Sequence, residues 1–214
     1  MPENVTRFEN PPVRGFLHHP AALGGVALAL THGAGGNCTA PLLIAVAKAF
    51  CAAGFFVLRF DLPFRQRRPF GPPHPSTAAE DRAGIRAAIG AVSALASDRV
   101  FVGGHSYGGR QATLLAAEDP NACDGLLLLS YPLHPPKKPE QLRTAHFPSL
   151  DVPAFFIHGT VDPFGSPEEL AAAVKLIPSR TQIAFIEGAG HDLKRGKFDF
   201  DSLMIEPFAR LLNF

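Results

Sequence analysis

The chain has 214 residues, of which 46% are hydrophobic and 18% charged, and its formal net charge is +1. This composition excludes a disordered chain and argues against a general attraction to nucleic acid or membrane surfaces. The cysteines Cys38, Cys51 and Cys123 are widely spaced, so they predict neither a disulfide framework nor a cysteine-based metal site. The N-terminus has no signal-peptide pattern, and the apolar run near 21–30 is too short to span a bilayer. We therefore expect one cytoplasmic domain over residues 1–214.

Strands and helices are expected to alternate along the chain. Short continuous apolar runs predict buried strands, and longer amphipathic segments predict the helices between them. The expected strands are 13–19 (at an edge), 26–30, 55–60, 100–102, 125–130, 154–157 and 181–186, and the expected helices are 41–53, 77–96, 108–119, 166–177 and 201–212. This order predicts the α/β class, with a mostly parallel sheet, helices on both faces and right-handed crossovers.

Local signals mark two helix starts and two loops. Thr77-Ala-Ala-Glu80 has the pattern of a capping box, and Ser166 is followed by a proline and by a glutamate three residues on. The proline-rich segments 63–75 and 132–152 predict irregular loops.

The sequence Gly-His-Ser-Tyr-Gly at 104–108 lies between a Val-Phe-Val strand and a helix. A serine at such a sharp turn has strained backbone, and glycines two residues away on each side let strand and helix approach closely. The Ser106 hydroxyl would then project from the sheet edge at the positive end of a helix, which suits a nucleophile. A phosphate-cradling turn or a purely structural turn is the alternative.

A serine nucleophile needs a neighbouring base, and the base needs an orienting carboxylate. His191 follows the last strand, and Asp162 follows the strand before it. Because the carboxyl ends of parallel strands share one edge of the sheet, we expect Ser106, Asp162 and His191 to meet there as a catalytic triad. Asp192 is the rival carboxylate, although as the neighbour of His191 it is poorly placed to reach back to that ring.

Four motifs carry a resemblance to a known family: Gly-His-Ser-Tyr-Gly at 104–108, His-Gly-Ala-Gly-Gly at 32–36, His-Gly-Thr-Val-Asp at 158–162 and Gly-Ala-Gly-His at 188–191. With the order Ser, Asp, His, the chain resembles the α/β-hydrolase superfamily over nearly its whole length. Within it, the chain resembles the small lid-less branch related to dienelactone hydrolases. It looks most like a group of predicted hydrolases that includes a subunit of a histone-acetyltransferase complex; Asp61 stands where that group has asparagine more often.

The resemblance implies a single-domain α/β-hydrolase fold without a substantial lid, since the segment 132–152 is too short for a helical cap. It also implies an oxyanion hole made by the backbone N–H groups of Tyr107 and of Ala34, with Gly35 as the alternative second donor. The expected chemistry is a two-step acyl transfer through an acyl-serine, and it requires no metal or organic cofactor.

Three loops at the expected active edge are rich in basic residues: 63–75, 132–152 and 188–198. They suggest a positive rim that favours anionic acyl substrates, with Arg67 and Arg68 as candidate carboxylate-binding groups. Solvated surface charge is the alternative. Tyr131 and Phe164 are candidates for an apolar acyl pocket, with ordinary packing as their alternative.

The predicted function is hydrolysis of small soluble esters, with a small-molecule acyl substrate as the partner. Thioesterases, peptidases and dienelactone hydrolases would use the same triad, as would a perhydrolase- or haloperoxidase-like side activity. A non-catalytic binding module on the same scaffold is the alternative of a different class, because fold alone does not establish activity.

Overall fold

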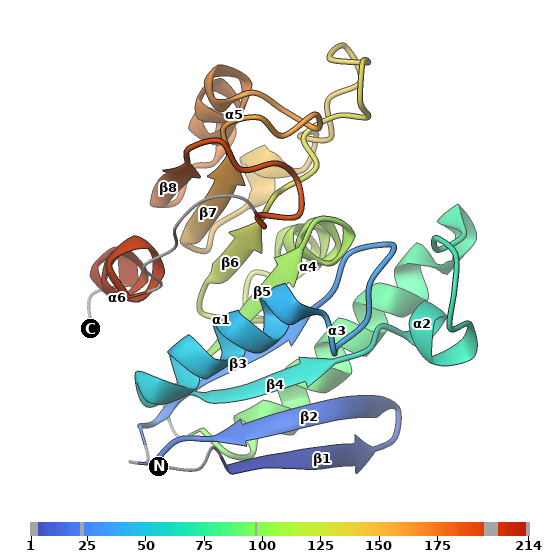
Figure 1. The fold of residues 1–214 in the computed structure, drawn as a ribbon, viewed down its shortest axis with the longest axis vertical. Helices are drawn as coiled ribbons and strands as arrows, with labels where there is room; N and C mark the ends of the chain where they lie inside the picture. The colour runs from blue at the N-terminus through green and yellow to red at the C-terminus, as the bar shows by residue number, and fades with distance from the viewer. Residues whose placement is uncertain (1–3, 22–23, 97, 195–200, 213–214) are drawn as a thin grey trace.

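The computed structural model describes residues 4–21, 24–96, 98–194 and 201–212. Its centre is an eight-stranded sheet with the order β1-β2-β4-β3-β5-β6-β7-β8 (Figure 1). The strands are β1 (Asn4–Asn10), β2 (Val13–His19), β3 (Val26–Thr31), β4 (Phe56–Phe60), β5 (Arg99–His105), β6 (Leu126–Leu129), β7 (Ala154–Gly159) and β8 (Thr181–Ile186). The six strands from β4 to β8 in this order are parallel, and the β1–β2 hairpin pairs antiparallel with β4. The mostly parallel sheet predicted from the sequence is confirmed.

Helices cover both faces of the sheet. They are α1 (Pro41–Ala52), α2 (Pro63–Arg67), α3 (Ala78–Ser93), α4 (Tyr107–Glu118), α5 (Pro167–Ala173) and α6 (Glu206–Leu212), with shorter helical turns η1 (Pro75–Thr77), η2 (Phe147–Ser149), η3 (Val174–Leu176) and η4 (Asp201–Ile205). Buried side chains of α1 and α6 pack in one apolar cluster, and those of α3, α4 and α5 pack in the other. The continuous apolar strands are therefore buried on both sides, as parallel strands require.

Three local predictions were wrong. The first strand, β1, was missed because its residues are mostly polar and exposed at the sheet edge. Helix α2 begins the segment that was predicted to be a loop, with Pro63 at its first position. The Thr77 side chain caps no helix, because its hydroxyl donates instead to the carbonyl of His74 at 2.8 Å. The capping box at Ser166 does form, with both reciprocal bonds to Glu169 present.

The topology places an active edge at the reversal of strand order. The chain runs from β3 to β4 in one direction and then returns to place β5 on the other side of β3. The loops after β3 and β5 therefore diverge from neighbouring strand ends, which is where open α/β sheets bind ligands. The segment between β6 and β7 contains only the turn η2, so this segment forms no helical lid over the edge. None of the helices among the described residues combines the length and apolarity of a membrane span.

The packing of α3 can be tested by replacing each of two of its glycines with alanine. A Cβ at Gly84 would lie 2.4 Å from Pro63 Cδ, whereas a Cβ at Gly90 would meet nothing within 4 Å. We expect Gly84→Ala to lower the free energy of unfolding by about 1–3 kcal/mol through overpacking. Gly90→Ala should raise it by about 0.5–1 kcal/mol, because alanine loses less backbone entropy in a helix. Urea unfolding of both variants would refute this packing if the two changes had the same sign.

Candidate active site

Ser106 occupies the sharp turn between β5 and α4. Its backbone angles are φ 50° and ψ −113°, outside the regions that non-glycine residues normally adopt. The turn is held because the Ser106 N–H donates to the Leu129 carbonyl on the next strand at 2.8 Å, and the Ser106 carbonyl accepts from Arg110 N–H at 2.9 Å. Strained backbone held by its surroundings is characteristic of functional sites.

The two glycines of the motif allow this turn to form. A Cβ at Gly104 would lie 2.4 Å from the backbone nitrogen of Gly109, and a Cβ at Gly108 would lie 2.6 Å from the carbonyl oxygen of His32. Backbone atoms cannot yield as a flexible side chain can, so any larger residue would force strand, helix and the β3 loop apart. The close approach predicted for both glycines is confirmed.

The side chains of Ser106, His191 and Asp162 form one chain of hydrogen bonds. Ser106 Oγ lies 2.8 Å from His191 Nε2. His191 Nδ1 lies 2.8 Å and 3.0 Å from the two carboxylate oxygens of Asp162. Since a carboxylate only accepts, Nδ1 carries the proton and Nε2 is free to accept the serine proton. This arrangement can abstract a proton from the hydroxyl and stabilise the imidazolium that results.

Asp162 is held in a buried position after β7. Its side chain is fully buried, and Oδ1 also accepts a hydrogen bond from Phe164 N–H at 2.9 Å. By contrast, Asp192 is exposed and pairs with Lys194, whose Nζ lies 3.3 Å from its carboxylate. The structure therefore brings Asp162, and not Asp192, to the ring of His191.

Two further contacts hold His191, one at its ring and one at its backbone. The ring of Phe164 stacks on it, with 4.1 Å between centroids and 29° between planes. The ring nitrogen Nε2 of His105 lies 2.8 Å from the backbone carbonyl of His191, so the residue before the nucleophile ties its strand to the loop that carries the base. These contacts limit rotation of the ring away from Ser106.

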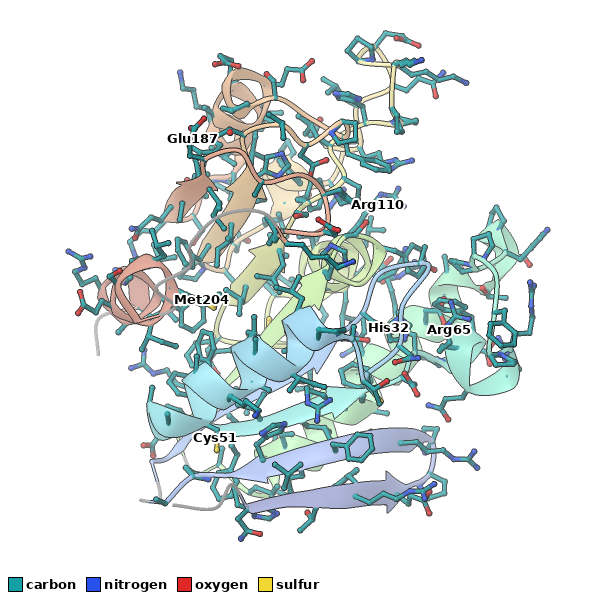
Figure 2. The ribbon with its side chains drawn as sticks, in the orientation of Figure 1. His32, Cys51, Arg65, Arg110, Glu187 and Met204 are labelled. Carbon is teal, nitrogen blue, oxygen red and sulfur yellow. The ribbon has the colours of Figure 1, made fainter. Side chains whose placement is uncertain are left out.

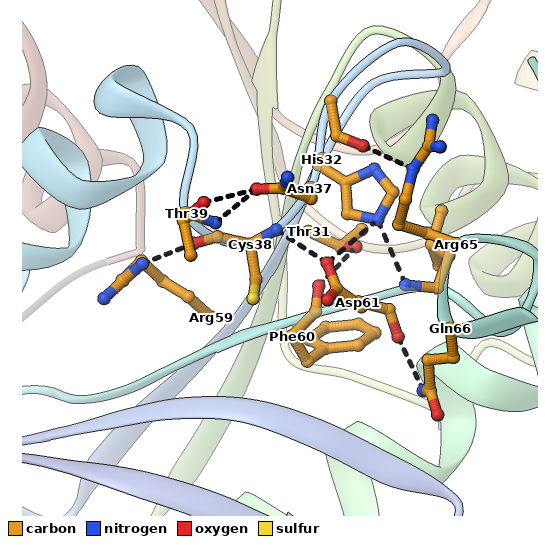
Figure 3. A network of polar contacts seen from close by, with 12 residues as sticks. Thr31, His32, Asn37, Cys38, Thr39, Arg59, Phe60, Asp61, Arg65 and Gln66 are labelled. Atoms are coloured by element: carbon orange, nitrogen blue, oxygen red, sulfur yellow. Dashed lines mark hydrogen bonds and ion pairs between the residues drawn. The ribbon is translucent and has the colours of Figure 1, made fainter. Parts of the chain in front are cut away.

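The loop after β3 lies directly beside the nucleophile. A Cβ at Gly33 would lie 2.9 Å from His105 Nδ1 and 3.3 Å from Ser106 Cβ, so glycine favours this close approach. His32 supports the loop from inside: Nδ1 lies 2.8 Å from the Gly33 carbonyl, and Nε2 accepts from Leu62 N–H at 3.2 Å (Figure 3). Its ring is thus neutral, and desolvation lowers its pKa. His32 is therefore a support of the loop.

The carboxylate of Asp61 belongs to the same support (Figure 3). It accepts from the backbone N–H of Cys38 at 2.7 Å and lies 3.6 Å from His32 Nε2. Burial, with Asp61 nearby, raises the pKa of the Cys38 thiol to about 12, so this cysteine is no nucleophile at neutral pH. Among the described residues, no three His, Cys, Asp or Glu side chains gather as metal ligands.

Tyr107 begins α4, so its backbone N–H has no partner within the helix. Its side chain is anchored on the far side by Asp81, whose carboxylate accepts from the Tyr107 hydroxyl at 2.8 Å and from Phe64 N–H at 3.0 Å. Asp81 is buried, and desolvation raises its pKa. The tyrosine side chain therefore serves to hold the helix start, while its N–H remains available to a ligand.

A cavity of about 660 Å³ opens beside Ser106 and His191. Its other walls come from the loop after β3, the start of α1, the end of β5, the loop after β7 and the residues after His191. They are lined by His32, Gly33, Ala34, Gly35, Gly36, Ala40, Pro41, Leu42, Leu43, Ala45, His105, Phe164, Asp192, Leu193 and Lys194. Most of this wall is apolar, and the cavity suits an acyl group of modest size.

The structure assigns different places to the four predicted substrate contacts. Phe164 lines the cavity, but Tyr131 is buried in the core with its hydroxyl donating to the Arg143 carbonyl at 2.7 Å. Arg67 is ion-paired with Glu80 of α3, and neither Arg67 nor Arg68 lines the cavity. The predictions for Tyr131, Arg67 and Arg68 are thus corrected. Residues 195–198 of the third basic loop lie outside the described residues.

The sequence interpretation missed the cavity wall formed by α1 and by Leu193. Leu42 and Ala45 were treated as parts of an amphipathic helix, and only their place after the glycine-rich loop could have indicated a second role. Arg65 was counted as a rim charge, whereas it is only 6% exposed. Arg65, Gln66, Arg67 and Arg68 are neighbours in the chain but differ in burial. Amino-acid composition alone does not show which of them is buried.

The burial of several histidine rings should lower the free energy of unfolding at acidic pH. Desolvation lowers the pKa of four histidines: His32, His105, His146 and His158. It brings the pKa of His146 to about 4. In the unfolded chain each titrates near pH 6.5. Below that pH the unfolded state binds protons that the folded state does not, so the free energy of unfolding should fall as pH decreases from 7.5 to 5.

Urea unfolding across this range measures the effect. His146→Gln should flatten the pH dependence, because it removes a buried ring whose pKa is about 4 in the folded protein. Equal stability at pH 7.5 and pH 5 in the unmodified protein would contradict the neutral, buried state of these rings.

Comparison with known proteins agrees with this architecture. The fold is similar to a dienelactone hydrolase from Anabaena variabilis (TM-score 0.68, 19% identity, covering 98% of this chain and 94% of that chain). It is also similar to Est1E from Butyrivibrio proteoclasticus (TM-score 0.72, 16% identity, 98% and 97%). A third similar structure is an α/β serine hydrolase without a lid from Xanthomonas campestris (TM-score 0.71, 17% identity, 99% and 92%). At these identities the likeness shows the fold. A family model described as "Alpha/beta hydrolase domain" matches residues 25–203, and the chain belongs to this family.

Proposed function

We propose that the protein is a serine hydrolase that cleaves small carboxylic esters. The observation that carries this proposal is the unbroken chain of hydrogen bonds from Ser106 Oγ through the His191 ring to the buried carboxylate of Asp162. Ser106 Oγ lies 2.8 Å from an imidazole nitrogen, and the other nitrogen of that ring is bound to a carboxylate, which is the arrangement that activates a serine nucleophile. The fold similarity to a dienelactone hydrolase and to a serine hydrolase without a lid supports the same reaction class.

In the proposed reaction, Ser106 Oγ attacks the ester carbonyl while His191 Nε2 takes the hydroxyl proton. The carbonyl oxygen becomes an oxyanion, which accepts hydrogen bonds from the N–H groups of Tyr107 and of Ala34 or Gly35. The tetrahedral intermediate collapses as His191 protonates the departing alcohol. Water, deprotonated by the same ring, then attacks the acyl-serine and releases the acid.

The cavity supports a substrate of modest size with an apolar acyl group. Ala34, Leu42 and Phe164 face it, and within the described ranges no helical lid closes its mouth. An ester with a short or compact acyl chain fits these conditions better than a long lipid, which needs a more extended apolar surface. We further propose a cytoplasmic location, supported by the free thiols of Cys38 and Cys123.

A fluorophosphonate probe and a short nitrophenyl ester test this function. The wild type should be labelled and active, and Ser106→Ala should lose both properties. Asp162→Asn should lower kcat by about 10³–10⁴-fold, because the ring loses its orienting carboxylate. Asp192→Asn, at the exposed neighbouring carboxylate, should retain near wild-type kcat. A folded wild type that neither reacts with the probe nor cleaves esters, thioesters or amides would favour a binding module.

The preference for anionic substrates depends on Lys194, which is the one lysine or arginine among the described cavity residues. Its ammonium is exposed and partly compensated by Asp192, so its effect should be small. We expect Lys194→Gln to lower kcat/KM about twofold to fivefold for an ester with a free carboxylate, but not for its neutral analogue. Arg67→Gln, outside the cavity, should change neither value. Equal losses for both esters would remove the proposed preference.

A further inference from the structure

Arg65 of α2 is a buried arginine that lies behind the loop following β3 (Figures 2 and 3). Its guanidinium binds backbone carbonyls from two loops. Nε donates to Gly36 at 2.7 Å, and Nη2 donates to Ala34 at 2.8 Å and to Gly71 at 3.0 Å. Nη1 donates to Arg68 at 3.0 Å. Within the described part of the chain, no carboxylate forms an ion pair with this buried charge.

The bond to Ala34 sets the direction of one peptide group. In a trans peptide, the carbonyl and the following N–H point in opposite directions. Because the Ala34 carbonyl points to Arg65, the Gly35 N–H points away from it. The Gly33 carbonyl is likewise held by Gly36 N–H at 3.0 Å, so the Ala34 N–H points away from that contact. Neither N–H donates a hydrogen bond within the described residues, and both remain available.

The two residues that carry these N–H groups line the same cavity as Ser106. The loop that holds them runs close to the nucleophile, because a Cβ at the preceding Gly33 would lie 3.3 Å from Ser106 Cβ. If the peptide between Ala34 and Gly35 flipped, its carbonyl oxygen would face the place where negative charge develops. The direction of this peptide therefore decides whether the loop attracts or repels an oxyanion.

We propose that Arg65 is the positioning residue of the oxyanion hole. The guanidinium holds the Ala34–Gly35 peptide in the donor orientation, and its buried positive charge polarises that peptide so that the Gly35 N–H becomes a stronger donor. This inference rests on the proposed function, because it concerns the transition state of the same acyl transfer. Arg65 itself does not touch the substrate.

The geometry requires an arginine. The planar fork reaches Ala34, Gly36 and Gly71 at the same time from one side chain. The Arg65 Cζ atom lies over the ring of Phe64, 4.9 Å from its centroid, and this cation–π contact helps to hold the guanidinium in place. A lysine would keep the charge, but a single ammonium on a flexible stem cannot satisfy carbonyls spread over this fork.

Arg65→Lys and Arg65→Gln test the inference, with Arg67→Lys on the same helix as the matched control. We measure kcat and KM for a short nitrophenyl ester and the inhibition constant of a trifluoromethyl ketone, which adds to Ser106 and places an oxyanion in the hole. Both Arg65 variants should lose about 10²–10³-fold in kcat with KM changed less than about threefold. Binding of the ketone should weaken by the same factor as kcat/KM, and Arg67→Lys should resemble the wild type.

Circular dichroism and thermal unfolding show whether the variants keep the native fold. A folded Arg65 variant with wild-type kcat, or one that changes only KM, would overturn the inference while leaving the proposed function intact. If neither variant folded, the role of Arg65 would be stability of the whole sheet, and the inference would also be overturned. A wild type that cleaves no acyl substrate would instead refute the proposed function, on which the inference rests.

Discussion

The hydrogen bond between Ser106 Oγ and His191 Nε2 joins parts of the chain that are 85 residues apart. It forms only if β5, β8 and their following loops end at the same edge of the sheet. The strained backbone at Ser106 brings the hydroxyl to this edge, and the bond from Ser106 N–H to the Leu129 carbonyl keeps it there. Parallel strands and glycine contacts thus provide the structural basis of the proposed chemistry.

Buried polar residues support the reacting groups from behind. Asp81 anchors the side chain of Tyr107, Asp162 orients His191, and Arg65 binds the loop that carries Ala34. Burying a charge is unfavourable unless hydrogen bonds compensate for the lost water. Each of these groups has two or more such bonds. The hydrogen bonds that compensate for burial therefore also fix the donors and acceptors whose positions matter for acyl transfer.

The sequence was sufficient to predict the parallel sheet and the meeting of Ser106, Asp162 and His191, because strand-end positions are a consequence of topology. It was insufficient for β1, whose exposed polar residues have no apolar period, and for α2, whose prolines resembled those of a loop. Substrate contacts were least predictable. Tyr131 and Arg65 turn inward for hydrogen bonds to carbonyls that are distant in sequence, and local pattern carries no information about such partners.

The central claim is that Ser106 accepts an acyl group from the substrate. A nitrophenyl carbamate tests it directly, since the carbamoyl-serine it forms hydrolyses slowly and can be located by peptide mass spectrometry. We expect one carbamoyl group for each chain, on the peptide that contains Ser106, with release of one nitrophenol. A carbamoyl group on a different residue, or nitrophenol release with no group on Ser106, would contradict it.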